Sequence, residues 1–486
     1  MAKEEYNKLF VGGDLSGIQK FLYNISSKKA AVSLKGRSYF LQQYMENICG
    51  GLKEITKNAG DQQSIVIYCS GGKFYLITDY SLKIVEAIDQ YTLKVKGELW
   101  ANHRGQLGIN IGYVPFTENP DGSVDCNGQS HIRPGYLWKV VNADFFKQKS
   151  QKFKEQFASD YKSFFTPIPM GGKTKVCAIT GIESDDCLPV KLSEEGDSYV
   201  LPSVLEQIQM GEKLRDREHF KSFEDYAGNT NLGILRMDVD GLGKRFIEGF
   251  DSIRSYQQFS DRLVDFFGAE LRKMQQAYRE YLNIIYSGGD DLFVVGRWDK
   301  VIDFAELIHK ETISHFGKEG ISISGGVAIV KPSFPIAKAA QLSGEAEEAA
   351  KQFRNGEKNA FHFLGKTVSW DGEFNYVKSY KNQFISLINN FSLSKSILHK
   401  LMLYASIAKQ NEMRRSEGKA EDFSYVWHIS YYLTRYMERY KSNDAVCSFC
   451  RTLRDKELTF KNNDKLQLIA LAARWAELLL KDKITN

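Results

Sequence analysis

Hydrophobic and polar positions follow the same order in two widely separated parts of the chain. Residues 9–22 read LFVGGDLSGIQKFL, and residues 233–246 read GILRMDVDGLGKRF. Each is a short apolar run, then a turn, then a helix-like stretch. At an offset of 224 residues, Asp14 aligns with Asp238. The pattern predicts two copies of a strand that leads through a tight turn into a helix.

A second pair of similar segments follows in the same order. Residues 65–77 read IVIYCSGGKFYLI, and residues 282–295 read LNIIYSGGDDLFVV. An apolar run, Ser-Gly-Gly and another apolar run form the pattern of a β-hairpin with a glycine-rich turn. At an offset of 217, the Ser-Gly-Gly of residues 70–72 aligns with that of residues 287–289. Two offsets that nearly agree predict an internal duplication.

A last strand and amphipathic helices complete the copies. Residues 107–114 and 321–330 are the candidate last strands, and residues 263–274 place apolar side chains at helical spacing. Another helix is predicted around residues 336–353. Strand, helix, hairpin, helix and strand is the order of a ferredoxin-like, or palm, unit. We therefore predict an α+β fold with two such palm domains.

The rest of the chain divides around these two units. The segment after the first palm resembles an insertion, and the last part of the chain lacks strand signals and is rich in helical spacing. The predicted domains are a first palm with its insertion over residues 1–165, a connector over 166–225, a second palm over 226–372 and an all-α C-terminal domain over 373–486.

The composition is that of a soluble globular protein. Of the 486 residues, 43% are hydrophobic and 26% are charged, and the net charge of +5 is too small to indicate a nucleic-acid partner by itself. The 7 cysteines are odd in number and irregularly spaced, which favours a reducing compartment. The polar N-terminus and the lack of a long apolar run predict a cytoplasmic protein without a membrane segment.

Carboxylates gather at one predicted sheet edge of the second copy. Asp290 and Asp291 stand at the tip of the predicted hairpin, and Asp238 ends the strand expected beside it. Such a cluster is repulsive without cations, and Mg²⁺ takes one or two carboxylates together with phosphate oxygens. We predict that these residues bind two Mg²⁺ or Mn²⁺ ions and catalyse nucleotidyl transfer. The alternative is that Gly-Gly-Asp-Asp is only a polar hairpin tip, but the flanking strands favour catalysis.

Other polar residues surround this predicted site. The glycines at 288 and 289, which follow Ser287, allow a tight turn that a triphosphate can approach. Strand alternation places Asp240 on the face of the strand acid, either as a supporting acid or as a surface charge. Lys358, after the second palm's last predicted helix, either neutralises a triphosphate or is simply solvated.

The first copy lacks the hairpin acids. Its hairpin reads Gly71-Gly72-Lys73-Phe74, and its only carboxylate at an equivalent position is Asp14. One carboxylate cannot hold two metal ions. The first palm is therefore predicted to be a nucleotide-binding partner of the catalytic palm.

Several blocks of sequence carry a family resemblance. The blocks GGDLSGIQKFLYNISSKKAAVSLKGRSYFLQ (12–42), LRMDVDGLGKRF (235–246), YSGGDDLFVVG (286–296) and SISGGVAIV with FPIAKAA (322–340) resemble the large polymerase-like subunit of type III CRISPR effector complexes. The type III-A branch is the closer match. The blocks occur in the family's order and span most of residues 9–370, which makes the resemblance specific.

The resemblance implies an activity and a set of partners. Members of the family work with a guide RNA and small protein subunits, sense target RNA and convert ATP into cyclic oligoadenylate second messengers. In this chain Asp238, Asp290 and Asp291 match the metal-binding acids. Gly288 and Gly289 match the turn under the phosphates of ATP. With Ser287 beside them and Lys358 after the last palm helix, they make up the predicted nucleotide-binding residues of the catalytic palm. The residues that fall where a second ATP would lie are Ser16, Ser70, Gly71 and Gly72.

The chain departs from the family's pattern in its cysteines and histidines. No His-Asp dipeptide occurs among its 8 His, and the chain starts on the first palm strand, so no HD nuclease domain and no DNase activity are predicted. Cys177 and Cys187 each keep only the first cysteine of a Cys-x-x-Cys pair. The connector is therefore predicted to be a degenerate zinc-ribbon remnant in which zinc is unlikely. Cys447 and Cys450 form a lone Cys-x-x-Cys, more often buried thiols than a metal site.

Three functions remain open from the sequence. The leading one is a cyclic oligoadenylate synthase within an RNA-guided complex. The second is a free-standing cyclic nucleotide synthase, and the third is a scaffold subunit that binds guide RNA and small subunits with vestigial acids. The intact acids disfavour a scaffold alone, whereas the large helical C-terminal domain favours a scaffolding role beside catalysis.

Overall fold

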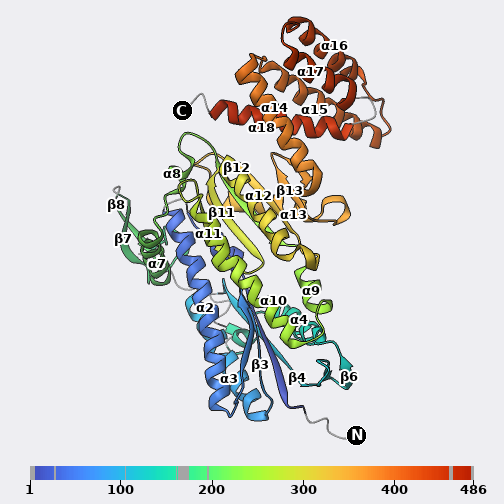
Figure 1. Cartoon of the computed structure of the whole chain (residues 1–486). Coiled ribbons are helices and arrows are strands. Elements are labelled where there is room, and N and C mark those ends of the chain that lie inside the picture. Colours follow the sequence, from blue (N-terminus) through green and yellow to red (C-terminus); the bar gives the residue numbers. More distant parts are fainter. Residues whose placement is uncertain are drawn as a thin grey trace. The chain divides into compact units, whose positions relative to one another are not determined.

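The computed structural model describes residues 6–26, 29–103, 105–159, 161–162, 175–193, 196–458 and 463–482 (Figure 1). They belong to two compact units. The first comprises residues 1–228, 232–322 and 330–343, and the second comprises residues 229–231, 323–329 and 344–486. Both glycine-rich hairpins therefore lie within one compact unit.

The first sheet has six strands in the order β2-β3-β1-β4-β5-β6. These strands are β1 (Lys8–Ser16), β2 (Ile65–Ser70), β3 (Lys73–Asp79), β4 (Gly108–Glu118), β5 (Val124–Cys126) and β6 (Gln129–Ile132). Its first four strands are antiparallel to their neighbours and stand in the order second, third, first, fourth. This arrangement agrees with the ferredoxin-like unit predicted for the first copy.

Strand alternation gives β1 two apolar faces. Leu9 and Val11 enter one core with α2 (Ala30–Asn58) and α3 (Leu82–His103). Phe10 points to the opposite face, where its ring centroid lies 4.4 Å from that of Trp138. Trp138 belongs to α4 (Gly135–Ser150), so the predicted insertion supplies a helix that packs on the sheet. The short helices α1 (Ile18–Tyr23) and α5 (Lys154–Ser159) complete this region.

The second sheet repeats the strand order as β10-β11-β9-β12-β13-β14. Its strands are β9 (Leu232–Val239), β10 (Leu282–Ser287), β11 (Asp291–Arg297), β12 (Ile323–Val330), β13 (Ala360–Phe363) and β14 (Lys366–Ser369). The helices of this palm are α9 (Leu242–Glu248), α10 (Ile253–Asp265), η1 (Phe266–Glu270), α11 (Leu271–Gln276), α12 (Trp298–Phe316), η2 (Gly317–Glu319), α13 (Ile336–Lys351) and η3 (Phe353–Asn355). The shared order of the first four strands supports the predicted duplication.

The strand ladders correct one of the two predicted alignments. Lys73 lies opposite Asp14 in the first sheet, and Asp291 lies opposite Asp238 in the second. The offset of 224 for the first strand therefore holds, but the hairpins match at 218 and not at 217. The identical letters Ser-Gly-Gly caused the error, because the two-residue turn is Gly-Gly in one hairpin and Gly-Asp in the other. The residues at the positions of the second palm's acids are thus Gly72 and Lys73, not Lys73 and Phe74.

The predicted connector contains a small sheet and two helices. They are β7 (Leu188–Ser193), β8 (Gly196–Val200), α7 (Pro202–Glu218) and α8 (Phe223–Ala227). Residues 166–174 of the predicted connector lie outside the described residues. Cys177 and Cys187 are buried in an apolar cluster with side chains of α2, α7 and α8. In the structure both thiols therefore take part in the core.

Arg37 of α2 ties the first palm to the connector. Its side chain is 1% exposed, and its guanidinium donates to the carbonyls of Phe21 at 2.5 Å and Asn24 at 3.0 Å, where α1 ends. It also donates to the side-chain oxygen of Gln207 on α7 at 3.1 Å. Burial lowers the pKa of Arg37 to about 10, so the group stays charged at neutral pH. These are charge-assisted hydrogen bonds, which are stronger than neutral ones.

His103, at the end of α3, packs against the rings of Phe21 and Phe40. Burial, followed by the positive charge of Arg37, lowers the pKa of His103 to about 4. The imidazole is therefore neutral in the folded chain at pH 7, whereas an unfolded chain binds a proton there below about pH 6.5. The stability that this neutral ring contributes is fully present above pH 6.5 and is lost as the pH falls toward 4.

Lowering the pH from 7 to 5 should cost the fold about 2 kcal/mol through His103 alone. The measurement is urea unfolding of the wild type and of His103→Leu at both pH values. Because the variant has no imidazole to protonate, its unfolding midpoint should fall less than that of the wild type. An equal fall in both proteins would contradict the buried neutral state of His103.

The second unit carries the helices of the C-terminal region. These are η4 (Trp370–Phe374), α14 (Asn375–Phe391), α15 (Ser396–Ser416), α16 (Ser424–Arg439), α17 (Asp444–Thr452), η5 (Leu453–Glu457) and α18 (Asn463–Asp482). The long helix α18 packs against α14 and α15. Cys450 on α17 is buried, and burial raises the pKa of its thiol to about 12. The expectation of buried thiols is therefore confirmed for Cys450, whereas Cys447 is only partly buried.

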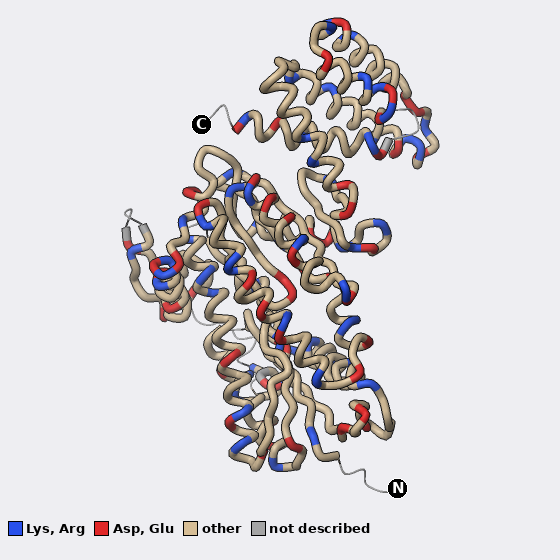
Figure 2. Tube along the Cα trace, in the orientation of Figure 1, with Lys and Arg blue, Asp and Glu red and all other residues tan. Residues whose placement is uncertain are grey.

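Lys and Arg alternate with Asp and Glu along the helices (Figure 2). Many of them form ion pairs, such as Lys96 with Glu155 at 3.0 Å and Lys29 with Glu212 at 2.6 Å. Within the described ranges, no helix combines the length and the apolar character needed to cross a membrane.

Candidate active site

Asp238 and Asp291 face each other across two neighbouring strands. Asp238 lies at the penultimate position of β9 and Asp291 begins β11, and they are direct partners in the antiparallel ladder. Directly opposed side chains on one face have Cβ atoms about 5 Å apart. One residue closer to the hairpin tip, the Val239 amide donates a hydrogen bond to the Asp290 carbonyl at 2.8 Å. Backbone pairing alone therefore brings two of the predicted acids together.

Asp290 occupies the tip of the hairpin, which we call the acidic turn (residues 287–291). Its carboxylate oxygen lies 3.2 Å from the position that a methyl group on Gly71 would take. Among the residues that the structure describes, no three His, Cys, Asp or Glu side chains are grouped to hold a metal ion. What the backbone pairing does place together is one opposed carboxylate pair, Asp238 and Asp291, with Asp290 next to it along the chain. Mg²⁺ takes one or two carboxylates together with phosphate oxygens, so the residue types of this pair fit its coordination habit.

Asp240 is buried, with 7% of its surface exposed. Its carboxylate accepts a hydrogen bond from the Ser322 hydroxyl at 2.8 Å, and its amide donates to the Ser322 carbonyl at 2.8 Å. The alternative that Asp240 is a surface charge is therefore wrong. It fixes the chain between β9 and α9, directly after the strand that carries Asp238.

The tips of the two hairpins touch. A side chain at Gly71 would overlap the carbonyl oxygen of Gly288, and a side chain at Gly289 would overlap the hydroxyl of Tyr68. The position of such a methyl group on Gly289 also lies 2.9 Å from the Ser70 hydroxyl. The methyl group on Gly71 would thus meet backbone, whereas the one on Gly289 would meet side-chain hydroxyls. Both glycines also have positive φ angles, of 60° and 85°, which glycine adopts without strain. Ser70 and Gly71 of the first hairpin therefore lie against the acidic turn, whereas a side chain at Gly72 would meet side chains of its own palm.

Two tyrosines, which sequence reasoning missed, flank the acidic turn: Tyr68 is buried and Tyr286 is partly buried. Burial raises the pKa of Tyr68 well above its usual value, and the charges of Asp290 and Asp291 raise it further. Burial and then Asp291 and Asp290 do the same to Tyr286. The two residues are equivalent at the offset of 218, each paired with an aromatic residue on the next strand. A Tyr in both hairpin segments was the signal in the sequence that could have found them.

In the first palm, two lysines lie near its one remaining strand acid, Asp14. Asp14 is buried, and its carboxylate forms an ion pair of 2.5 Å with the ammonium of Lys149 on α4. Lys73 is the cross-strand partner of Asp14 and takes the position of Asp291. The first palm therefore balances its remaining acid with a side-chain cation. This agrees with the prediction that it is not the catalytic palm.

Lys149→Met should destabilise the first palm by about 1–3 kcal/mol, because it leaves the buried Asp14 carboxylate without its cation. The measurement is the midpoint of urea unfolding at pH 7. Adding Asp14→Asn to this variant should recover part of the loss, since the uncompensated charge is then removed. Lys147→Met, on the same helix and exposed, is the control and should change stability by less than about 0.5 kcal/mol.

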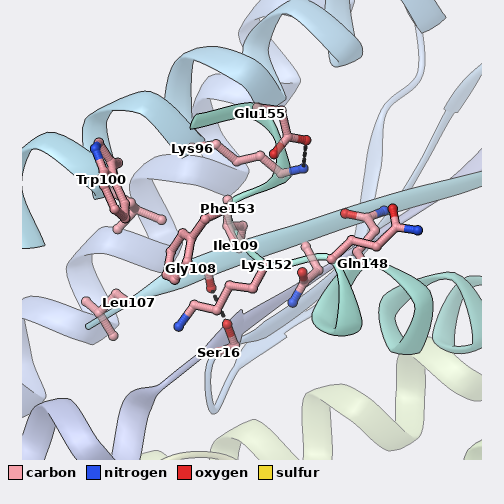
Figure 3. A pocket seen from close by; sticks show the side chains of 13 residues that line it. Ser16, Lys96, Trp100, Leu107, Gly108, Ile109, Gln148, Lys152, Phe153 and Glu155 are labelled. Atoms are coloured by element: carbon pink, nitrogen blue, oxygen red, sulfur yellow. Dashed lines mark hydrogen bonds and ion pairs between the residues drawn. The ribbon is translucent and has the colours of Figure 1, made fainter. Parts of the chain in front are cut away.

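Ser16 lines a small pocket beside the end of β1 (Figure 3). Its hydroxyl donates to the Gly108 carbonyl at 3.0 Å, and Lys152 and Phe153 line the same pocket. The pocket measures about 40 Å³, which is room for a few water molecules and too little for a nucleotide. A place for Ser16 in a second ATP site stays a prediction.

The remaining predicted residues lie on different elements. The Ser287 hydroxyl donates to the Phe267 carbonyl at 2.7 Å, on the sheet face opposite to Asp291. Ser287 thus anchors β10 to η1. Lys358 belongs to the second unit, in the loop before β13, and its role as a phosphate ligand stays a prediction.

Two domain models match this chain. The Csm1 subunit domain B matches residues 7–167, and the Cas10/Cmr2 second palm domain matches residues 231–362. The two matches contain the two glycine-rich hairpins. They confirm the resemblance to the large palm-domain subunit of type III CRISPR effector complexes, III-A-like, that the sequence blocks predicted.

Curated relatives match much of this chain. The CRISPR system single-strand-specific deoxyribonuclease Cas10/Csm1 (subtype III-A) of Enterococcus italicus is 27% identical over 418 residues, which are 72% of this chain and 53% of that protein. The protein of the same name from Streptococcus thermophilus is 25% identical over 90% of this chain and 63% of its own length. The chain thus spans about half of the length of the first relative and about three fifths of the length of the second.

Solved structures share the fold. The apo Csm1-Csm4 cassette matches with a TM-score of 0.68 and 17% identity, over 98% of this chain and 70% of that chain. The Csm1-Csm4 cassette in complex with pppApA gives the same TM-score, and that in complex with cA4 gives 0.66 over 98% of this chain and 70% of that one. At this identity the likeness establishes the architecture.

Proposed function

Because this chain carries domain B of the Csm1 subunit and the second palm domain of the Cas10/Cmr2 proteins, we propose that it is an ATP-dependent nucleotidyltransferase. Its product is a cyclic oligoadenylate, made by metal-assisted transfer between ATP molecules. The observation that carries the proposal is the direct opposition of Asp238 and Asp291 beside a glycine-rich turn. That solved Csm1-Csm4 cassettes are described in complex with ATP, pppApA and cA4 supports the choice of adenylate.

The residues of the acidic turn have separate tasks in this proposal. Asp238 and Asp291 hold the metal ions, and Asp290 lies beside them at the tip, where it can complete the ligand set. Mg²⁺ or Mn²⁺ bound there would lower the pKa of the attacking hydroxyl and stabilise the negative charge on the leaving pyrophosphate. The space into which side chains at positions 288 and 289 would project is filled by the hydroxyls of Tyr286 and Tyr68, so in this proposal the turn meets a triphosphate through its backbone.

In its biological setting, we place the chain as the large subunit of an RNA-guided type III-A complex. Guide RNA, target RNA and small effector subunits are its partners, and target RNA activates the reaction. The relatives are described as single-strand-specific deoxyribonucleases, and this chain spans 53% and 63% of their length. DNase activity of the chain itself is not expected. Robust cutting of single-stranded DNA by the purified chain would contradict that expectation.

The deciding experiment follows ATP. The chain, alone and assembled with its small subunits, guide RNA and target RNA, is incubated with labelled ATP and Mg²⁺ or Mn²⁺, and products are identified by mass spectrometry. Cyclic oligoadenylate should form in the complete complex and disappear in an Asp290→Ala/Asp291→Ala variant. Product that persists in the variant would sink the assigned site.

The same experiment separates the alternatives. Product formed without any RNA would favour a free-standing cyclic nucleotide synthase. An assembled complex that binds target RNA and makes no product with either metal would favour a scaffold subunit with vestigial acids. The matched control is Asp251→Asn, since Asp251 is 88% exposed and should leave the reaction unchanged.

A further inference from the structure

Tyr68 lies at the point where the first palm meets the acidic turn. Its side chain is 6% exposed, and it stands on β2, two residues before the turn of its own hairpin begins at Ser70. A methyl group on Gly289 would overlap the Tyr68 hydroxyl. The phenol oxygen is therefore seated against the backbone of the acidic turn, and the two residues belong to different palms.

The ring of Tyr68 also reaches the other element of the acid site. It meets the ring of Phe246 edge to face, with centroids 6.1 Å apart. Phe246 lies on α9, which begins at Leu242, directly after the segment that carries Asp238. One side chain of the first palm thus contacts both the hairpin of Asp290 and Asp291 and the helix that follows the strand acid. The neighbouring helix α10 packs on β2 in the same region (Figure 1).

Tyr68 is itself held in place. Tyr75, its partner on β3, packs against it with a ring centroid 6.5 Å away. Burial, then Asp290 and Asp291, raise the pKa of Tyr68 well above its usual value, so the phenol is neutral at any working pH. A neutral, fixed ring can lie beside two carboxylates without adding charge to them.

Each palm contributes one tyrosine hydroxyl that lies against a glycine of the acidic turn. A methyl group on Gly288 would overlap the hydroxyl of Tyr286, on the same hairpin, whereas one on Gly289 would overlap that of Tyr68. Tyr286 and Tyr68 are equivalent in the duplication. Each glycine of the turn therefore rests against one tyrosine, and only one of the two tyrosines comes from the catalytic palm.

We propose that Tyr68 is a positioning residue for the acidic turn. By contacting Gly289 and Phe246 at once, it sets the spacing between the hairpin acids and Asp238. This gives the first palm a task in catalysis although it lacks the hairpin acids. The catalytic half of the inference rests on the proposed function, whereas the structural half concerns only the order of the turn.

The test compares Tyr68→Leu with Phe116→Leu. Phe116 is a fully buried residue of the same palm, at the opposite end of β1 from Asp14, so both changes shrink an aromatic side chain in one core. Hydrogen exchange, followed by mass spectrometry, should become about tenfold faster over residues 287–292 in Tyr68→Leu and stay unchanged there in Phe116→Leu. Unchanged exchange in Tyr68→Leu, or an equal increase in Phe116→Leu, would overturn the proposal.

Kinetics in the ATP assay give the second readout. Tyr68→Leu should lower kcat about 10–100-fold and change KM for ATP by less than about threefold, because geometry and not ground-state binding is lost. Tyr68→Phe keeps the ring and should stay within about threefold of the wild type. A wild type that makes no product under any condition would refute the proposed function, and the exchange comparison would still decide the role of Tyr68.

A reciprocal variant covers the case in which Tyr68→Leu does not fold. Gly289→Ala places a methyl group against the Tyr68 hydroxyl. It should speed exchange of the acidic turn less in a Tyr68→Phe background than in the wild type, because the overlapping oxygen is gone. Strictly additive effects of the two substitutions would overturn the proposed contact.

Discussion

Asp291→Asn should lower ATP conversion by at least about 10³-fold, the largest effect expected for this chain, because it removes one of the two opposed carboxylates that we propose as metal ligands. The expected loss corresponds to about 4 kcal/mol of transition-state stabilisation. Asp238→Asn should have the same effect, since the two residues are partners in one ladder. The measurement is kcat for cyclic oligoadenylate formation in the assembled complex at saturating Mg²⁺.

The same variant should not be less stable than the wild type. Like charges directly opposite each other on a sheet are destabilising, so in metal-free buffer the unfolding midpoint of Asp291→Asn should equal or exceed that of the wild type. Lost activity with retained stability distinguishes a ligand from a structural acid. A variant that keeps more than a tenth of its activity, or that unfolds readily, would contradict the assignment of Asp291.

Gly71→Ala should lower kcat about 10²-fold, although Gly71 lies in the palm without hairpin acids. Gly71 has a φ of +60°, and a methyl group there would overlap the Gly288 carbonyl and approach Asp290 within 3.2 Å. The acidic turn has to move, and a displacement of about 1 Å can cost about 10²-fold in rate. The measurement is kcat for ATP conversion, together with hydrogen exchange over residues 287–292.

Gly128→Ala is the matched control for this prediction. Gly128 also has a positive φ, of 74°, but a methyl group there meets nothing within 4 Å. Both variants carry backbone strain, which costs on the order of 1 kcal/mol, so both should unfold at slightly lower denaturant. Only Gly71→Ala should lose activity. Equal activities in the two variants would show that the contact between the hairpin tips does not matter for the reaction.

Local patterns were sufficient to predict the two palms. The apolar run before Asp14 and the one before Asp238 are periodic over a few residues, and periodicity of that length reports strand and helix directly. The Ser-Gly-Gly turns mark hairpins because glycine adopts without strain the positive φ angles found at Gly71 and Gly289. The family resemblance rested on the same blocks, and the domain matches confirm it.

Aligning the two hairpins by their identical residues gave the wrong strand register. The Ser-Gly-Gly strings align at 217, but the ladders place Lys73 and not Phe74 at the position of Asp291. A one-residue shift exchanges the two faces of a strand, so the error concerned which residue faces the acid site. Only backbone pairing resolves such a shift, because the pairs join residues that are far apart along the chain.

What the sequence by itself determined is the duplicated fold and the identity of the acids, since both follow from short-range pattern and residue chemistry. Tertiary structure alone decided which groups surround those acids. The ion pair of Asp14 with Lys149, the burial of Asp240 against Ser322 and the seat of Tyr68 on Gly289 join residues 82 to 221 positions apart. Contacts of that kind depend on how helices and hairpins pack, and packing leaves no periodic signal along the chain.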